Sequence, residues 1–256
     1  MTRYLAGIGV AGALALGSAA APPQAVELRL VSQRPLGGAG YAELGLTGEN
    51  KPNGLEYRLR RSVPPELPGF VPRTRAGLEL FIADRTADGW LAFYRGPLAG
   101  LPDSANVPFR TVFFNAKGQR RWELELNPLL SRPDHLEVQD VRYADGRLYF
   151  NEACQSYSRE AGGRCSALVR VDPARRRVEW RTGPLVSNNV FLVHGRWLIA
   201  GYGFTAEPDF VHVVDRGTGR VLARRRVDSA PSYFEIKDGR LHVVTHTSMY
   251  VFALRT

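Results

Sequence analysis

The side chains that could perform chemistry are few in this sequence. Of its five histidines, only His135 and His246 fall in segments with the character of irregular loops. His242 and His246 are four positions apart, so a strand would place both on one side but too far apart to share a metal ion closely. Because no third matched ligand accompanies them, the sequence predicts no metal site.

Catalytic motifs are equally sparse. The sequence has no G-x-S-x-G elbow, no phosphate-binding loop and no pair of carboxylates at a spacing that fixes a glycosidase geometry. Glu207 and Asp209 flank Pro208, a pattern that is more typical of residues that shape a loop. The sequence therefore indicates no particular reaction and predicts no cofactor.

The N-terminus has the pattern of a secretion signal. Arg3 precedes an apolar run over residues 4–16, and small residues follow it. We expect cleavage after Ala20, which makes residues 1–20 a signal peptide. The alternative is a membrane anchor, but the run is shorter than the roughly 20 residues that cross a bilayer. No cysteine follows it to carry a lipid, and no later segment has the hydropathy of a transmembrane span. The sequence predicts a secreted or periplasmic protein.

The sequence contains two cysteines, Cys154 and Cys165, and the expected export determines their oxidation state. Thiols oxidise in extracytoplasmic compartments, so we expect these neighbours to form a disulfide bond that fixes a loop. Without a nearby histidine, the pair makes half a zinc site at most.

The formal net charge of +9 comes almost entirely from arginine, since Lys51, Lys117 and Lys237 are the only lysines. Such a charge suggests an anionic partner. The alternative is that genomic base composition, and not selection for binding, produces the bias toward Arg, Ala, Gly and Leu. Two arginine runs could form a basic rim that weakly contacts an anionic surface, or could protect solvated edge strands. They are Arg175, Arg176 and Arg177, and Arg224, Arg225 and Arg226. The chain lacks the interleaved aromatic residues of a single-strand nucleic-acid platform, so we predict no nucleic-acid partner.

A hairpin pattern recurs in the second half of the chain, and the strands that it predicts determine where the polar residues of the connecting loops lie. Two runs of β-branched and aromatic residues flank a tight turn, at 145–147, 194–196 and 238–240, which is a strong hairpin signal. Further hairpins turn at 115–118 and 215–219, where the first side chain can bond turn amides and glycine accepts positive φ. The units recur about every 40 to 50 residues, the length of a four-stranded propeller blade.

These repeats predict an all-β protein with a single β-propeller domain over residues 21–256, of about five or six four-stranded blades. Segments 41–47 and 55–61 indicate one earlier hairpin. The last unit ends after its third strand, at residues 249–254, and lacks an outer strand. The segment from Val26 to Val31 has strand character, so we expect it to pair with the C-terminal strand and close the ring.

One repeat resembles a known family. The run from Asp215 to Arg220, and Asp172 followed by Trp180, resemble the tryptophan-docking repeat of pyrroloquinoline quinone-type propellers in the quinoprotein-like superfamily. The resemblance implies that Trp122 and Trp180 pack against the next blade, whereas Ala223 takes the equivalent place in the third unit. This chain lacks the adjacent cysteine pair of the quinone-dependent dehydrogenases and is much shorter, so the resemblance does not extend to quinone binding.

In such a fold the tight turns gather at one face and the irregular connections at the other. We predict a ligand site at the axial end of the irregular face. Its candidate residues stand where the innermost strands begin and the next strands end: Gln139, Asp140, Glu152, Asn188, Asn189, Tyr202, Ser232, Tyr233 and His246. An alternative explanation is that these Asn, Ser and Asp side chains satisfy backbone amides at the strand starts.

Three functions stay open at this stage. The first is a non-enzymatic protein that binds a protein, peptide or glycan through the irregular face. The second is a hydrolase or lyase, which should bring Asp140, Glu152 or His246 within hydrogen-bonding distance of one another. The third is a structural or surface-associated protein that uses the arginine rim.

Overall fold

The computed structural model describes residues 26–36, 63–64, 66–96, 107–132, 136–204 and 206–255. The predicted signal peptide, the predicted hairpin within 41–61 and His135 lie outside these residues. Regular structure in the described part of the chain consists of β-strands and one short 3₁₀ helix, Asn127–Leu129. The prediction of an all-β protein is confirmed.

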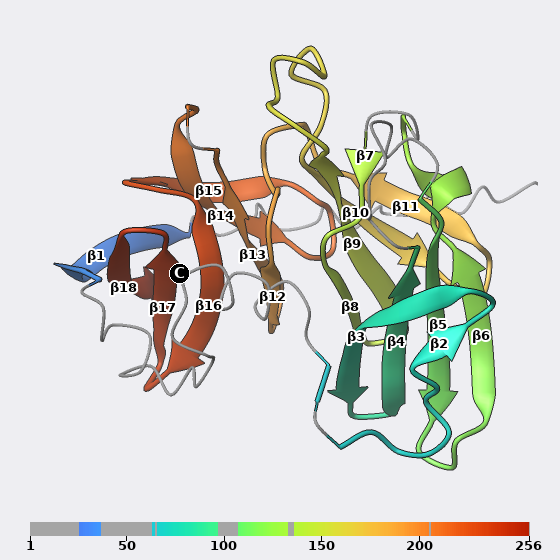
Figure 1. Ribbon diagram of the computed structural model, residues 1–256. Coiled ribbons are helices and arrows are strands. Elements are labelled where there is room, and N and C mark those ends of the chain that lie inside the picture. Colours follow the sequence, from blue (N-terminus) through green and yellow to red (C-terminus); the bar gives the residue numbers. More distant parts are fainter. Residues whose placement is uncertain are drawn as a thin grey trace, which may run out of the picture.

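The strands form four antiparallel sheets (Figure 1). The first sheet contains β2 (Thr74–Arg75), β3 (Leu78–Thr86), β4 (Gly89–Arg95), β5 (Phe109–Asn115) and β6 (Arg120–Glu125). The second contains β8 (Val141–Ala144), β9 (Arg147–Cys154), β10 (Ala167–Asp172) and β11 (Arg177–Arg181), with β7 (Leu136–Glu137) also paired to β9. The third contains β12 (Phe191–His194), β13 (Trp197–Tyr202), β14 (Asp209–Asp215) and β15 (Val221–Val227).

The fourth sheet joins the two ends of the described chain. It contains β16 (Pro231–Lys237), β17 (Arg240–Thr245), β18 (Ser248–Arg255) and β1 (Glu27–Pro35). β1 pairs antiparallel with β18, in a register that places Leu28 opposite Leu254. The predicted pairing of the N-terminal strand with the C-terminal strand is confirmed.

The sheets pack face to face in chain order, each pair enclosing an apolar core. Phe93 and Phe150 lie in the core between the first and second sheets, Leu168 and Leu198 between the second and third, and Val213 and Phe252 between the third and fourth. Single strands of neighbouring sheets also touch, since β8 contacts β3 and β12, and β12 contacts β16. The four sheets therefore form a continuous series in which β3, β8, β12 and β16 lie along one side.

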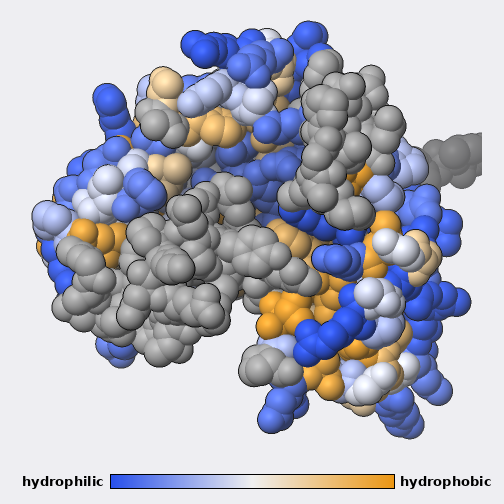
Figure 2. All heavy atoms as spheres, in the orientation of Figure 1, coloured by the Kyte–Doolittle hydropathy of each residue, from blue (hydrophilic) through white to orange (hydrophobic). Residues whose placement is uncertain are grey.

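The first sheet is apolar on both of its faces. One face contributes to the core shared with the second sheet, and the other contributes Leu80, Tyr94 and Val112 to a separate cluster with Phe70 and Val71. Figure 2 shows hydrophobic side chains gathered on the lower right of the molecule, in the region of these strands. A sheet with two apolar faces requires cover on both sides.

The tight turns form as predicted. Asp145 and Asp238 adopt positive φ, of 49° and 51°, directly before the glycines of their hairpins. Asn115, Asp172 and Asp215 each accept two backbone N–H bonds of their own turns through Oδ1. These side chains provide the local turn structure that the hairpin pattern required.

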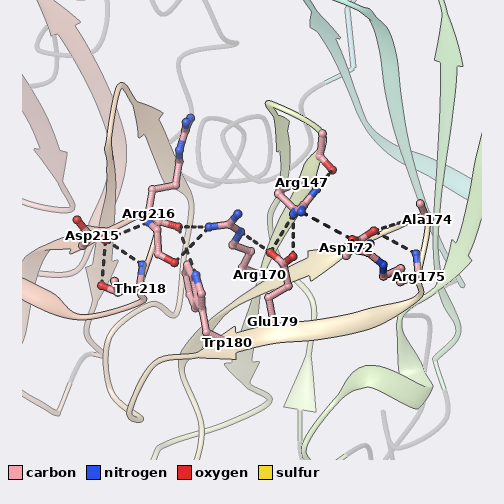
Figure 3. A network of polar contacts seen from close by, with 12 residues as sticks. Arg147, Arg170, Asp172, Ala174, Arg175, Glu179, Trp180, Asp215, Arg216 and Thr218 are labelled. Atoms are coloured by element: carbon pink, nitrogen blue, oxygen red, sulfur yellow. Dashed lines mark hydrogen bonds and ion pairs between the residues drawn. The ribbon is translucent and has the colours of Figure 1, made fainter. Parts of the chain in front are cut away.

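The two predicted tryptophan contacts are present. Trp180 of β11 donates from Nε1 to the Arg216 carbonyl in the turn between β14 and β15 of the next sheet, at 3.3 Å (Figure 3). Its ring lies over Gly219, whose φ is +74°. Trp122 of β6 contacts Tyr143 of β8 in the next sheet, with ring centroids 5.4 Å apart. Each contact joins the last strand of one sheet to the following sheet.

Substituting Gly219 with alanine should measure this docking contact. A methyl group there would lie 2.7 Å from the Trp180 ring, whereas one at Gly239, with a similar φ of +69°, would meet nothing within 4 Å. We expect Gly239→Ala to cost about 1 kcal/mol of unfolding free energy, from backbone strain alone. Gly219→Ala should cost about 3 kcal/mol, because overpacking adds to the strain. Equal losses in denaturant unfolding would contradict the docking contact.

His212 in β14 is a buried histidine, 3% exposed. Burial, aided by the charge of Arg224, lowers its pKa from 6.5 to about 4. Its Nδ1 atom has no hydrogen-bond partner among the described residues. The fold therefore favours the neutral imidazole.

The stability of the protein should depend on pH through this residue. The pKa of His212 is lower in the folded protein than in the unfolded chain. The stability that comes from keeping this imidazole neutral is therefore fully present above pH 6.5 and is lost as the pH falls toward 4. The free energy of unfolding of the wild type and of His212→Gln should be measured between pH 7 and 4. Subtracting the two curves removes the effect of the other titrating groups, which both proteins share. We expect the wild type to lose about 3 kcal/mol relative to the variant. Parallel curves would show that His212 does not titrate as described.

Candidate functional site

The irregular connections gather at the ends of the sheets opposite the tight turns, and we call this end the loop face. It consists of segments 136–140, 155–166, 182–190, 203–204 and 206–208, 228–230 and 246–247. The predicted site residues lie in or beside these segments. Their side chains occupy several separate environments.

Asp140 forms a polar hub between β3, β8 and β12, which belong to three different sheets. Its carboxylate accepts from the N–H groups of Val141 and Phe191, at 2.9 and 2.8 Å, and from Arg142 at 3.1 Å. Arg142 in turn donates to the Phe191 carbonyl and lies 3.5 Å from Asp84 on β3. The hub thus ties β3, β8 and β12 together at their shared side.

Burial raises the pKa of the Asp140 carboxyl to about 6, although Arg142 and the N–H donors oppose this shift. Asp140 is 1% exposed, whereas the Arg142 side chain is 22% exposed. A ligand at this end would therefore meet the guanidinium before the carboxylate. Sequence reasoning missed Arg142, although a charged residue two positions after Asp140 in a strand gave a signal.

Two asparagine side chains, those of Asn151 and Asn188, organise the backbone around this hub. Asn151 accepts from the N–H groups of Gln139 and Asp140, at 3.0 and 2.9 Å, and donates to the Asn189 carbonyl at 2.6 Å. Asn188 accepts from the Cys154 N–H at 2.8 Å. The side chains of Asp140, Asn151 and Asn188 thus bind backbone groups. This agrees with the alternative explanation given above, in which such residues satisfy backbone amides at the strand starts. Asn151 was not among the predicted residues.

Gln139 differs from these residues in one respect. It is buried, yet its Oε1 atom has no hydrogen-bond partner among the described residues. Its Nε2 atom donates to Glu137. The side-chain carbonyl could accept a bond from a ligand.

Glu152 is held in a buried ion pair. It is 1% exposed and accepts from Arg181 through both oxygens, at 2.8 and 2.9 Å. It also accepts from the N–H and hydroxyl groups of Ser131, at 2.8 and 2.9 Å. Because Arg181 also donates to the Leu129 carbonyl, the carboxylate fixes the segment after β6 to the second sheet. Sequence reasoning did not identify either partner, since both lie far from Glu152 in the chain.

The disulfide bond predicted between Cys154 and Cys165 is present, with their Cα atoms 5.1 Å apart. The segment 155–165 between these cysteines projects at the top of Figure 1, and we call it the disulfide lobe. It contacts the β13–β14 connection through Glu207, which accepts from the Ser158 N–H and hydroxyl groups at 2.8 and 2.7 Å. The Tyr202 hydroxyl donates to the same carboxylate. Tyr202, a predicted site residue, is therefore a support for the lobe.

Aromatic and basic side chains accompany these polar contacts. Tyr157 of the lobe packs against Phe204, with ring centroids 5.7 Å apart, and the Arg159 guanidinium lies over the Tyr157 ring at 5.2 Å. Arg159 is exposed, while Tyr157 and Phe204 are partly exposed. The lobe presents a fixed surface that combines aromatic and cationic groups.

The remaining predicted residues lie on the fourth sheet. Ser232 donates to the Val244 carbonyl at 3.3 Å, and partial burial raises the pKa of Tyr233. His246 is exposed. No hydrogen bond joins Asp140, Glu152 and His246 to one another, although all three lie in the described part of the chain. The convergence expected of a catalytic site is absent among these three side chains.

Asp209 is a second carboxyl with a raised pKa, of about 6, through burial and then the nearby charge of Asp228. Its Oδ1 atom is buried without a hydrogen-bond partner among the described residues. A methyl group at Gly203 would lie 1.8 Å from that atom, so the carboxyl packs directly on the β13–β14 connection. This contact agrees with the loop-shaping role expected from the sequence.

Two absences concern the described residues only. Among residues 26–36, 63–64, 66–96, 107–132, 136–204 and 206–255, no group of three or more His, Cys, Asp or Glu side chains could hold a metal ion. Within the same ranges, no helix has the length and apolar character needed to cross a membrane.

No family model matches the sequence, and no curated protein matches it. Several solved structures align with the fold. A chain of the mitotic checkpoint complex aligns with a TM-score of 0.42 and 9% identity over 68% of this chain, which spans only 48% of that one. BamB from Moraxella catarrhalis aligns at 0.32 and 11% identity, covering 70% of this chain and 74% of BamB. Myxococcus xanthus glutaminyl cyclase aligns at 0.38 and 11%, covering 71% and 75%. All three TM-scores are below 0.5, so these alignments do not define the fold of this chain. The packing of the sheets does, and the class it defines is an all-β protein whose antiparallel sheets pack in series.

Opening the disulfide bond should release the lobe without unfolding the sheets. The cysteines are 11 positions apart, and a closed loop of this length contributes about 2 to 3 kcal/mol. We therefore expect the double variant Cys154→Ala, Cys165→Ala to lose that amount of unfolding free energy and to become sensitive to protease within 155–165. Gly163→Ala, at a position with φ +68° and no neighbour within 4 Å, keeps the bond and is the control; it should cost only about 1 kcal/mol of backbone strain and leave the lobe resistant to protease. Unchanged stability and protease resistance in the double variant would contradict this role.

Proposed function

We propose that the protein is an exported, non-enzymatic β-propeller of quinoprotein-like repeats that binds a protein, peptide or glycan through its loop face. The observation that carries the proposal is the disulfide lobe. Two connections from neighbouring sheets are fixed there by a covalent bond and by the three contacts of Glu207. Loops fixed before binding lose little conformational entropy on binding, which favours recognition.

The propeller part of the proposal has support from the packing of the sheets. Four sheets pack in series through contacts of β8 with β3 and β12 and of β12 with β16, and β1 completes the last sheet. The first sheet, β2–β6, is apolar on both faces, as expected of a blade that lies between two neighbours. A single domain over residues 21–256 with about five blades is consistent with these features.

The export part has support from the bonded cysteines. Disulfide bonds persist in oxidising compartments, which agrees with the signal-peptide pattern of residues 1–20. We propose a secreted or periplasmic location on these grounds.

The absence of catalysis is proposed because the loop-face carboxylates already have structural partners. Asp140 binds two backbone amides, Glu152 binds Arg181 and Ser131, and Glu207 fixes the lobe. A catalytic carboxylate must instead be within reach of substrate. The hydrolase or lyase alternative has support only from the raised pKa values of Asp140 and Asp209.

The arginine rim supports an additional weak contact with an anionic surface. All six arginines of 175–177 and 224–226 are exposed, in or beside the last strands β11 and β15. Two of them have contacts within the protein, because Arg175 pairs with Asp172 and Arg224 lies over the Phe210 ring. Exposed charges of this kind act mainly at low salt.

Binding through the lobe can be tested with a displayed peptide library and a glycan array. We expect at least one saturable ligand, whose affinity falls roughly tenfold in Tyr157→Ala, Arg159→Ala, because aromatic and arginine side chains provide most of the binding energy at interfaces. Lys237→Ala, Arg240→Ala on the tight-turn face is the control and should change affinity by less than about twofold.

Melting temperature and an intact disulfide bond would confirm that the lobe variant is folded. The proposal fails if neither library contains a saturable ligand, or if every ligand binds the lobe variant as tightly as the wild type.

A further inference from the structure

An arginine-lined cavity lies at the opposite end of the sheets from the loop face. It has a volume of about 290 Å³ and lies where tight turns of the second and third sheets meet. Its lining includes Arg147, Arg170, Arg196 and Arg216. None of these residues belongs to the arginine rim or to the disulfide lobe, so a role for this cavity is independent of the function proposed above.

The lining of this cavity carries an excess of positive charge, because its four arginines face only two acidic residues, Asp145 and Asp215. Ion pairs join Arg196 to Asp215 and Arg216 to Asp145. Outside the lining, Glu179 pairs with Arg147 and Arg170, and Asp172 pairs with Arg147 (Figure 3). One carboxylate, that of Glu179, serves two guanidinium groups, at 2.9 and 2.7 Å.

The inner arginines are fixed in position. Arg170 donates to the carbonyls of Arg216 and Gly217, at 3.0 and 3.2 Å, in addition to its pair with Glu179. Arg147 donates to Glu179 and to the Gly146 carbonyl. These contacts hold two guanidinium groups at the wall of the cavity.

The outer arginines have partners that a ligand could replace. Arg216 pairs with Asp145, whose side chain is 76% exposed, and Arg196 pairs with Asp215 at 3.3 Å while being 51% exposed. Exposed pairs of this kind contribute about 0 to 1 kcal/mol. Asp215 also has a separate role, since its Oδ1 atom accepts from the amides of its own turn. An incoming anion would therefore displace Asp145 at little cost.

We propose that this cavity binds a phosphate or sulfate monoester group. A guanidinium group presents parallel N–H donors that match two oxygens of such an anion, and several converge here from different strands and turns. Tyr149 also lines the cavity, and burial raises the pKa of its phenol, which therefore stays protonated and able to donate. The volume corresponds to about ten water molecules, at ~30 Å³ each, which leaves room for a sugar-sized group attached to the anion.

Calorimetric titration at constant ionic strength would test the proposal, with inorganic phosphate, inorganic sulfate, glucose 6-phosphate and glucose as probes. We expect saturable binding of the anionic probes and none of glucose. Tighter binding of glucose 6-phosphate than of phosphate would indicate a monoester ligand, and equal affinity would indicate a site for the free anion. Both results support the anion site, whereas the absence of saturable binding for all three anionic probes overturns it.

Matched variants separate this site from the general positive charge of the protein. Arg216→Gln should weaken binding roughly tenfold, because a charge-assisted contact is lost, while Arg220→Gln, which removes the same charge near the end of the same turn, should change it less than about twofold. Asp145→Asn should tighten binding, because the competing carboxylate is gone. Asp238→Asn is its control, since Asp238 precedes glycine with nearly the same φ, 51° against 49°. Equal effects within either pair would overturn the assignment.

Discussion

The backbone pairing of β1 with β18 is the constraint on which the rest of the structure depends. The fourth sheet obtains only three strands from the C-terminal part of the chain, and β1 provides the fourth. Val26 and Leu28 also enter the core between the third and fourth sheets, so the same segment contributes apolar contacts. An unpaired strand edge would expose backbone groups to other chains. The pairing therefore completes the fourth sheet and joins the first described segment of the chain to its last strand.

Within that framework, several arginine side chains join different elements of the fold. Arg142 joins three sheets around Asp140, and Arg181 joins the segment after β6 to the second sheet through Glu152. Arg170 joins β10 to the turn of the next sheet beside the Trp180 contact. These internal roles account for part of the positive charge without a polyanionic partner. They also leave two distinct surfaces for which we propose ligand binding, the disulfide lobe and the arginine cavity, at opposite ends of the sheets.

Local features of the fold could be predicted from the sequence, whereas contacts between distant segments could not. The hairpins follow from turn residues such as Asp145-Gly146, the β1–β18 pairing from a unit that lacked a strand, and the disulfide bond from two cysteines in a chain expected to be exported. The predicted site residues do gather at one end, but the partners of Glu152 lie 21 and 29 positions away. Asn151 and Arg142 were missed because a polar residue in a strand reveals its partners only when the neighbouring sheet is in place. The arginine cavity combines separate strands and turns, so no sequence motif marks it.

Hydrogen exchange of the native protein, followed by mass spectrometry, tests the pairing of β1 with β18 most directly. If β1 completes the fourth sheet, the amides of β1 and β18 that bond each other should be protected together, at a level similar to β13 in the third sheet. A truncated chain without residues 27–35 should lose this protection in β18 first. Exchange of β1 at the rate of an unfolded peptide, with β18 fully protected, would contradict the account.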